Sequence, residues 1–175
     1  MDQEQVGATP AGEPEQASGF AQSVSGEQVQ FGPGFAVTVQ GGQDVSMSQA
    51  GALGVVAGQN MDLSYGGGVV QVAGGDMKIT NGGSQMMVVG GDLDVTNGGA
   101  QVILAGGDVA VTNGGGVLLA GQQVTAQKGF FGIAITPQLN LSDDSRVLLD
   151  TPRAAIFGLA FGAVFGLLSL LFRRK

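Results

Sequence analysis

The chain has 175 residues, 33 of them glycine, and contains no cysteine, histidine or tryptophan. This length fits one ordinary domain with tails, and the missing residue types remove disulfides, thiolate metal sites and the usual general base. Residues 1–127 carry eleven acidic residues and one basic residue, a net charge of −10, whereas residues 128–175 carry three acidic and six basic residues, a net charge of +3. An acidic body repels phosphate backbones, so we expect no nucleic-acid partner.

The N-terminal stretch, residues 1–25, is rich in Gln, Glu, Gly, Ala, Ser and Pro and has few large apolar side chains. Such a composition buries too little surface to offset the entropy of ordering the chain, so it predicts a disordered acidic tail. The stretch also lacks the basic and apolar regions of a secretory signal peptide.

A repeated phrase dominates residues 26–128. GGDMKITNGG begins at Gly74 and recurs 16 residues later as GGDLDVTNGG and again as GGDVAVTNGG. Each repeat holds two short runs of strand character, joined by N-G-G and G-G-D turns. A fixed period of this kind predicts an all-β fold: a flattened, two-sided or lopsided parallel β-solenoid (β-helix) of about six to seven rungs. The alternative is a meander of antiparallel hairpins that uses N-G as turns.

The second run of each repeat is apolar almost throughout. We expect residues 70, 86 and 102 and residues 72, 88 and 104 to point inward, which leaves an apolar face on the outside of the solenoid. The residues expected on that face are Val55, Met87, Val89, Ile103 and Ala105. It is either an ordinary scatter of surface apolar residues or a face that packs on another copy, on residues 129–150 or on lipid.

Two columns of polar side chains recur in register with the period. Asparagine tolerates the left-handed backbone region, and its amides can hydrogen-bond from rung to rung. Threonine suits strands, although a flat threonine array also resembles the face of ice-binding solenoids. We therefore predict a structural ladder made of Asn81, Asn97, Asn113, Thr80, Thr96 and Thr112.

A third column consists of Asp76, Asp92 and Asp108 at the other turn. Stacked carboxylates repel one another, so calcium is a candidate ligand. An Asx-turn, in which each carboxylate accepts an N–H of its own turn, explains the same residues without metal, and we prefer it. The nonapeptide of calcium-binding repeat proteins is absent. We expect no resident metal and no cofactor.

No group of residues in the sequence has the pattern of a catalytic site. Asp143 and Asp144 are adjacent and fit a solvated turn, and the glycine runs lack the Lys-Ser/Thr of a phosphate-binding loop. We expect that the protein is not an enzyme.

The C-terminal part departs from the period. Residues 129–150 are expected to form a cap and a linker, with Pro137 interrupting any strand, and residues 151–175 a transmembrane anchor. Residues 154–172 carry no charge over 19 residues, roughly 28 Å as a helix, which is enough to cross a bilayer. Gly158, Gly162 and Gly166 form a stripe that favours helix association, and Arg173, Arg174 and Lys175 suit the membrane interface.

Orientation is set by two opposing signals. The positive-inside rule favours a cytoplasmic C-terminus and an external solenoid, whereas the lack of an export signal favours a tail anchor with a cytoplasmic solenoid. We favour the cytoplasmic body. The expected function is a non-enzymatic, membrane-anchored β-solenoid scaffold or assembly protein, whose partners are the lipid bilayer and further copies of itself. The alternative is an outward-facing adhesin or a solenoid that binds ice, glycan or calcium.

Overall fold

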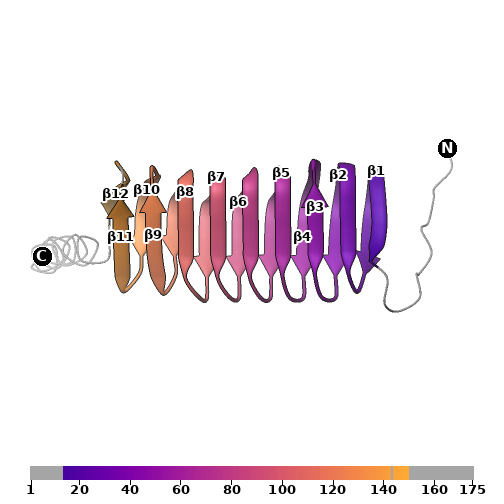
Figure 1. Cartoon of the computed structure of the whole chain (residues 1–175), viewed down its shortest axis with the longest axis horizontal. Coiled ribbons are helices and arrows are strands. Elements are labelled where there is room, and N and C mark those ends of the chain that lie inside the picture. The colour runs from indigo at the N-terminus through magenta and orange to yellow at the C-terminus, as the bar shows by residue number, and fades with distance from the viewer. Residues whose placement is uncertain (1–13, 143, 150–175) are drawn as a thin grey trace, which may run out of the picture.

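The computed structural model describes residues 14–142 and 144–149, and these form one stack of β-strands (Figure 1). All the strand pairings among these residues are parallel. The predicted all-β parallel β-solenoid is therefore confirmed, and the alternative hairpin meander is wrong. The stack has about eight turns, more than the six to seven expected.

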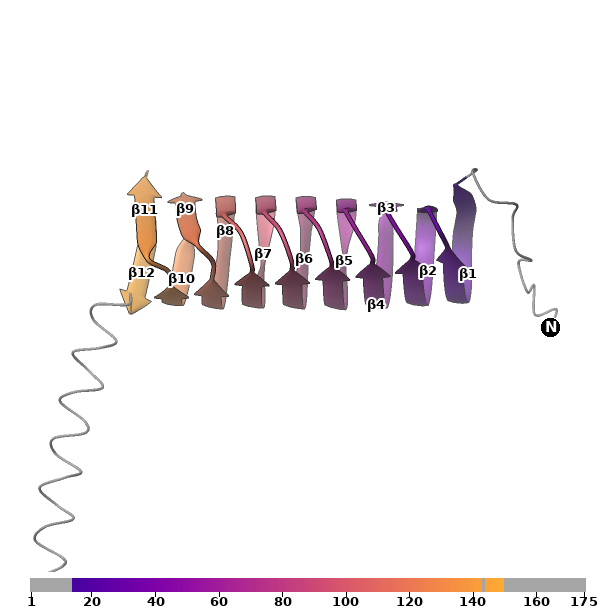
Figure 2. The same cartoon turned by 90° about the horizontal axis from the view of Figure 1, so that it is seen from below.

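Each turn of the solenoid contributes one long strand or two shorter ones, which follow one another along the stack (Figures 1 and 2). The strands are β1 (Glu15–Gly26), β2 (Val29–Gly41), β3 (Val45–Ser48), β4 (Ala50–Ala57), β5 (Met61–Ala73), β6 (Met77–Val89), β7 (Leu93–Ala105), β8 (Val109–Ala120), β9 (Gln123–Gln127), β10 (Phe130–Ile135), β11 (Gln138–Ser142) and β12 (Arg146–Leu149).

The register of the central strands repeats the sequence period. Thr80 on β6 pairs with Thr96 on β7, and Thr96 pairs with Thr112 on β8, so identical residues stack directly. Each parallel neighbour lies about 4.8 Å away. The period predicted from the sequence is thus the pitch of the solenoid.

The first turn corrects the predicted boundary of the N-terminal tail. β1 lies within residues assigned to a disordered tail, and it pairs with β2 from Glu15–Val29 to Gly26–Gly41. The step is 14 residues at one end and 15 at the other, with an irregularity between Ala17 and Gly19. Parallel pairing uses backbone groups and does not require the repeat's side chains, so a polar stretch out of period still adds a strand.

The last turns correct the prediction that residues 129–150 form a cap and a linker. β10 pairs with β8, β12 pairs with β10, and β11 pairs with β9, so the stack continues through this stretch. Pro137 lies between β10 and β11 and interrupts the strand there, as expected. The step shortens to 15 residues from Val109 to Val124 and from Gly115 to Phe130, so this stretch is out of the 16-residue frame.

Inward and outward positions alternate along each turn, but the alternation is reset at two bends. On β6, Met77 and Ile79 are buried before the first bend. Gln85 and Met86 are both exposed, and burial resumes at Met87. Two successive exposed positions indicate a second bend, so each turn has three alternating segments. The expected two-sided cross-section is wrong for that reason.

The second bend also reverses the expected phase of the third segment. Val55, Met87 and Ile103 are completely buried, and Val89 is nearly so, whereas all four were expected outside. Val70, Met86 and other residues expected inside are at the surface. The core consists of stacked aliphatic columns, and one of them runs through Val39, Val55, Gln71, Met87, Ile103 and Leu119.

Candidate functional site

The first bend carries the asparagine ladder. Asn81, Asn97 and Asn113 have φ values of 56°, 55° and 54°, in the left-handed region that asparagine tolerates. Asn97 Nδ2 donates to Asn81 Oδ1 at 3.1 Å, and Asn113 Nδ2 donates to Asn97 Oδ1 at 3.1 Å. Each amide therefore ties one turn to the next, as expected from the sequence.

The same left-handed corner extends beyond the asparagines. On neighbouring turns the equivalent residues also have positive φ: Gln49, Tyr65, Lys128 and Asp144. Asp144, expected in a solvated turn, is the corner residue of the last turn, and Asp143 lies outside the described residues. Gln49, Tyr65 and Lys128 have no local preference for this region, so stacking on adjacent turns sets their conformation.

Glycine follows each asparagine because two turns approach closely there. A Cβ on Gly83 would lie 2.7 Å from the carbonyl oxygen of Gly99 on the next turn. No side chain fits at that separation without moving the backbone. The N-G-G triplet is thus a requirement of the stack, and its repetition does not indicate a ligand.

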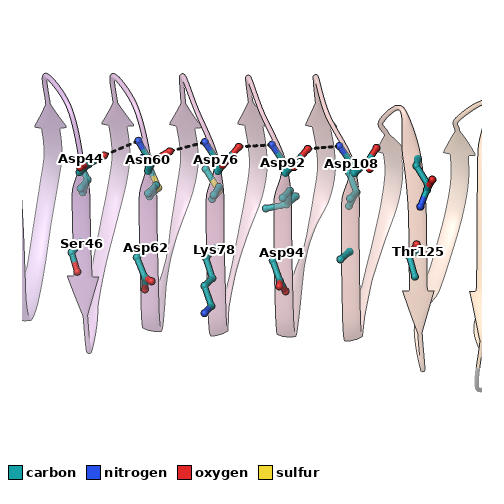
Figure 3. Close-up of a pocket in the computed structure, with 17 residues that line it drawn as sticks. Asp44, Ser46, Asn60, Asp62, Asp76, Lys78, Asp92, Asp94, Asp108 and Thr125 are labelled. Carbon is teal, nitrogen blue, oxygen red and sulfur yellow. Dashed lines mark hydrogen bonds between the residues drawn. The ribbon is translucent and has the colours of Figure 1, made fainter.

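The other turn carries the aspartate ladder, which we define as Asp44, Asn60, Asp76, Asp92 and Asp108 (Figure 3). Asp76 Oδ1 accepts the backbone N–H of Asp92 at 2.8 Å, and Asp92 Oδ1 accepts that of Asp108 at 2.7 Å. Every member of the ladder before Asp108 therefore accepts a backbone N–H of the following turn. The predicted Asx-turn within its own turn is wrong, because the closest free N–H belongs to the neighbouring turn.

An acidic groove runs beside this ladder along β3, β5, β6, β7, β8 and β9, with a volume of about 670 Å³. Its floor includes the outward residues Asp62, Lys78 and Asp94, which occupy equivalent positions on successive turns (Figure 3). With the ladder, the groove collects six carboxylates and a single ammonium group among the residues that line it.

The geometry gives calcium no convergent ligand set at Asp76, Asp92 and Asp108. Calcium needs six to eight oxygen ligands around one point, whereas the ladder spaces its carboxylates one turn apart and uses an oxygen of two of them for backbone N–H groups. Within residues 14–142 and 144–149, no group of three or more acidic residues is arranged to hold a metal ion.

The threonine column lies on the same face of the solenoid as the groove. Thr80, Thr96 and Thr112 stack in register and are half-buried. The outward column next to them is mixed, with Asp62, Lys78 and the equivalent residues of other turns. A single threonine column fits β-propensity and provides no flat two-column array.

The predicted membrane residues lie outside the described part of the chain. These are Gly158, Gly162, Gly166, Arg173, Arg174 and Lys175. Across the residues that the structure does describe, no helix has the length and apolar character needed to span a bilayer.

The sequence analysis missed two features of the described residues. One is Gln71, a completely buried polar side chain in the core. The other is an aliphatic outer surface on the third segment of each turn, formed by residues that were expected inside. Both phases of this segment are apolar on most turns, so the sequence contains no signal that separates the inward residues from the outward ones.

The fold and its ladders define the class: a parallel β-solenoid in which polar columns join successive turns. Comparison with protein-family models, curated proteins and solved structures found no match to the chain.

Proposed function

We propose that this protein is a non-enzymatic scaffold, a rigid β-solenoid held at a bilayer by a C-terminal helix. The proposal rests on the hydrogen bonds that the asparagine and aspartate ladders make within the solenoid. The asparagine and aspartate ladders direct their side chains at the next turn of the same molecule. Groups engaged in this way stabilise a rod, and they are poorly placed to bind a substrate.

The anchor rests on residues 154–172, which are uncharged and long enough to span a bilayer. β12 lies at the opposite end of the stack from β1, so an anchor that follows it holds the rod by one end. Eight turns at about 4.8 Å each then carry β1 roughly 35–40 Å from the membrane surface. A rod of this kind suits a spacer or a platform for assembly.

Extraction of membranes at alkaline pH tests the anchor. The full chain is expected to stay in the membrane pellet, and a chain ending at residue 150 is expected in the supernatant. A control that replaces Gly158, Gly162 and Gly166 with leucine should still sediment, because it keeps the segment apolar. Recovery of the full chain in the supernatant would refute the anchor.

Orientation is tested with a single reporter cysteine, since the chain has none. Ser18 is exposed on β1, so Ser18→Cys presents a thiol on the rod. We propose a cytoplasmic body and expect protection from an impermeant maleimide in intact cells, with labelling after lysis. Labelling of intact cells would place the rod outside.

The acidic groove favours a second candidate function, an outward-facing module that binds a cationic ligand along its row of carboxylates. Its support is the 670 Å³ groove with six carboxylates. This candidate requires external labelling of Ser18→Cys and a melting temperature that rises with calcium. An internal body with calcium-independent melting would eliminate it.

A further inference from the structure

The outward side chains of the third segment form a continuous aliphatic surface. We name it the outer apolar face and define it as Val56, Val70, Val72, Met86, Val88, Val102, Leu104, Leu118, Ala120, Ile133 and Ile135. Val56, Val70, Met86 and Ile135 are between 37% and 52% exposed, and the others are half-buried against their neighbours in the stack. No polar side chain interrupts it.

The same turns present a contrasting surface on their first segment. There the outward positions of β5, β6 and β7 are Asp62, Lys78 and Asp94, followed by Ser and Thr. Both surfaces consist of outward-pointing residues on parallel strands. The difference is therefore in the side chains alone, and an unbroken aliphatic ladder on one side is more than a scatter of surface apolar residues.

We propose that the outer apolar face packs against the same face of a second copy of this chain. A lipid surface is the poorer occupant, because the face has no Arg, Lys, Trp or Tyr to hold it at an interface. A second copy offers a complementary set of ladders at the same pitch.

The orientation of the two copies rests on the proposed anchor. Two rods held in one bilayer by the same end are parallel, so the two-fold axis relating them runs along the stack. Each turn then faces the same turn of the second copy, and the strands of the two facing sheets run antiparallel. The third segment has two outward residues on each turn. The first of them in one copy therefore faces the second of them in the other copy.

On two turns this arrangement matches a larger side chain with a smaller one. On β6, Met86 faces Val88 of the second copy, and on β8, Leu118 faces Ala120 of the second copy. Sheets that pack face to face lie about 10 Å apart, and their side chains interdigitate at that distance. On other turns the facing pairs are Val70 with Val72, Val102 with Leu104 and Ile133 with Ile135, so the contact is aliphatic along the stack.

The area of the outer apolar face is too small for a stable complex in solution but fits pairing between copies anchored in one membrane. The face is about 13 Å wide and 25–30 Å long, from four residue steps and six turns, or roughly 400 Å² of flat area per copy. A stable soluble complex usually buries about 800 Å² per partner. Anchoring confines both copies to a surface and raises their effective concentration, so a face of this size suffices there.

Crosslinking of the full chain in membranes tests the pairing. Two tagged forms are co-expressed, one with Val102→Cys and one with Leu104→Cys, and treated with a short bismaleimide. The matched control pair, Asp94→Cys with Thr96→Cys, has the same spacing on the same strand but lies on the polar surface. We expect mixed-tag dimers from the apolar pair and several-fold fewer from the control pair. Equal yields from the two pairs would overturn the proposal.

Two further outcomes separate the face from the anchor. Crosslinking of Val70→Cys with Ile133→Cys, without crosslinking of the same-turn pair, would overturn the parallel orientation. Absence of every crosslink in a chain that resists alkaline extraction would overturn the pairing through this face but not the membrane anchor.

Val88→Glu should abolish the same-turn crosslink, whereas Thr80→Glu, on the polar surface of the same strand, should leave it intact. Equal effects of the two substitutions would also count against the face.

Discussion

Gln71 is the one polar residue in a core column that is otherwise aliphatic. Its neighbours above and below are Val55 and Met87, and all three side chains are completely buried. Within the described residues, neither Nε2 nor Oε1 of Gln71 has a hydrogen-bond partner. We therefore expect that Gln71→Met, which keeps the length of the side chain and removes the amide, stabilises the protein.

The size of the effect follows from the two unsatisfied groups. Each buried donor or acceptor without a partner costs about 1–3 kcal/mol, and part of the gain is lost in repacking, so we expect a net gain of about 2 kcal/mol. Room for the new side chain exists because position 68 is glycine, where an added Cβ would lie 3.3 Å from Nε2 of Gln71. For a domain of this size, such a gain raises the melting temperature by roughly 5–10 °C.

The measurement is denaturant unfolding of the full chain in detergent, followed by circular dichroism, for the parent and Gln71→Met. Gln101→Met is the matched control, because Gln101 is exposed on β7 and the same change there should shift stability little. A loss of stability in Gln71→Met, with no change in Gln101→Met, would refute the reasoning. It would show that the Gln71 amide is satisfied in the folded protein.

Three further substitutions test the ladders by the same unfolding measurement. Tyr65→Asn places asparagine at a left-handed corner beside Asn81 and should add about 0.5–1.5 kcal/mol, whereas a loss would mean that the exposed ring of Tyr65 contributes packing. Asn97→Ala should cost about 1–3 kcal/mol and Asn97→Gly less, since glycine keeps the positive φ; equal losses would exclude a backbone contribution. Asp92→Asn keeps the acceptor, as Asn60 already does, and removes repulsion, so it should add about 0.5–1 kcal/mol at low salt and less at high salt; a loss would support a bound cation.

The sequence predicted the features that depend on one turn meeting the next. Asn81 and its equivalents recur because asparagine tolerates the left-handed corner and its side-chain amide hydrogen-bonds to the neighbouring turn. The register is likewise readable, since stacking of Thr80 on Thr96 is what selects a strict period. Both features depend on contacts between equivalent residues of adjacent turns, and a repeat in the sequence shows such residues directly.

The features that depend on the path of one turn were not readable in the same way. The second bend, between Gln85 and Met86, has no glycine or proline to mark it, and both phases of the following run are apolar. Because residues of both phases are apolar, the alternation alone did not show which of them face the core. β1 was missed for a different reason: its pairing uses the backbone, and its side chains are mostly polar.

The stack also implies that its turns differ in stability. Both ladders end before the terminal turns, with the aspartate ladder running from Asp44 to Asp108 and the asparagine ladder from Asn81 to Asn113. Among the described residues, β1 pairs with β2 only, and β11 pairs with β9 only. In a solenoid, stability is the sum of contacts between adjacent turns, so a turn with one neighbour and no ladder opens first.

Native-state amide hydrogen exchange measures this gradient directly. We expect the slowest exchange in β5, β6 and β7, faster exchange in β2 and β10, and the fastest in β1, β11 and β12. Each missing ladder bond is worth about 0.5–1.5 kcal/mol of opening free energy, which corresponds to roughly a 2- to 13-fold change in rate. Slow exchange in β1 that persists on dilution would contradict the gradient, whereas slow exchange lost on dilution would indicate that rods also meet end to end through their unpaired edges.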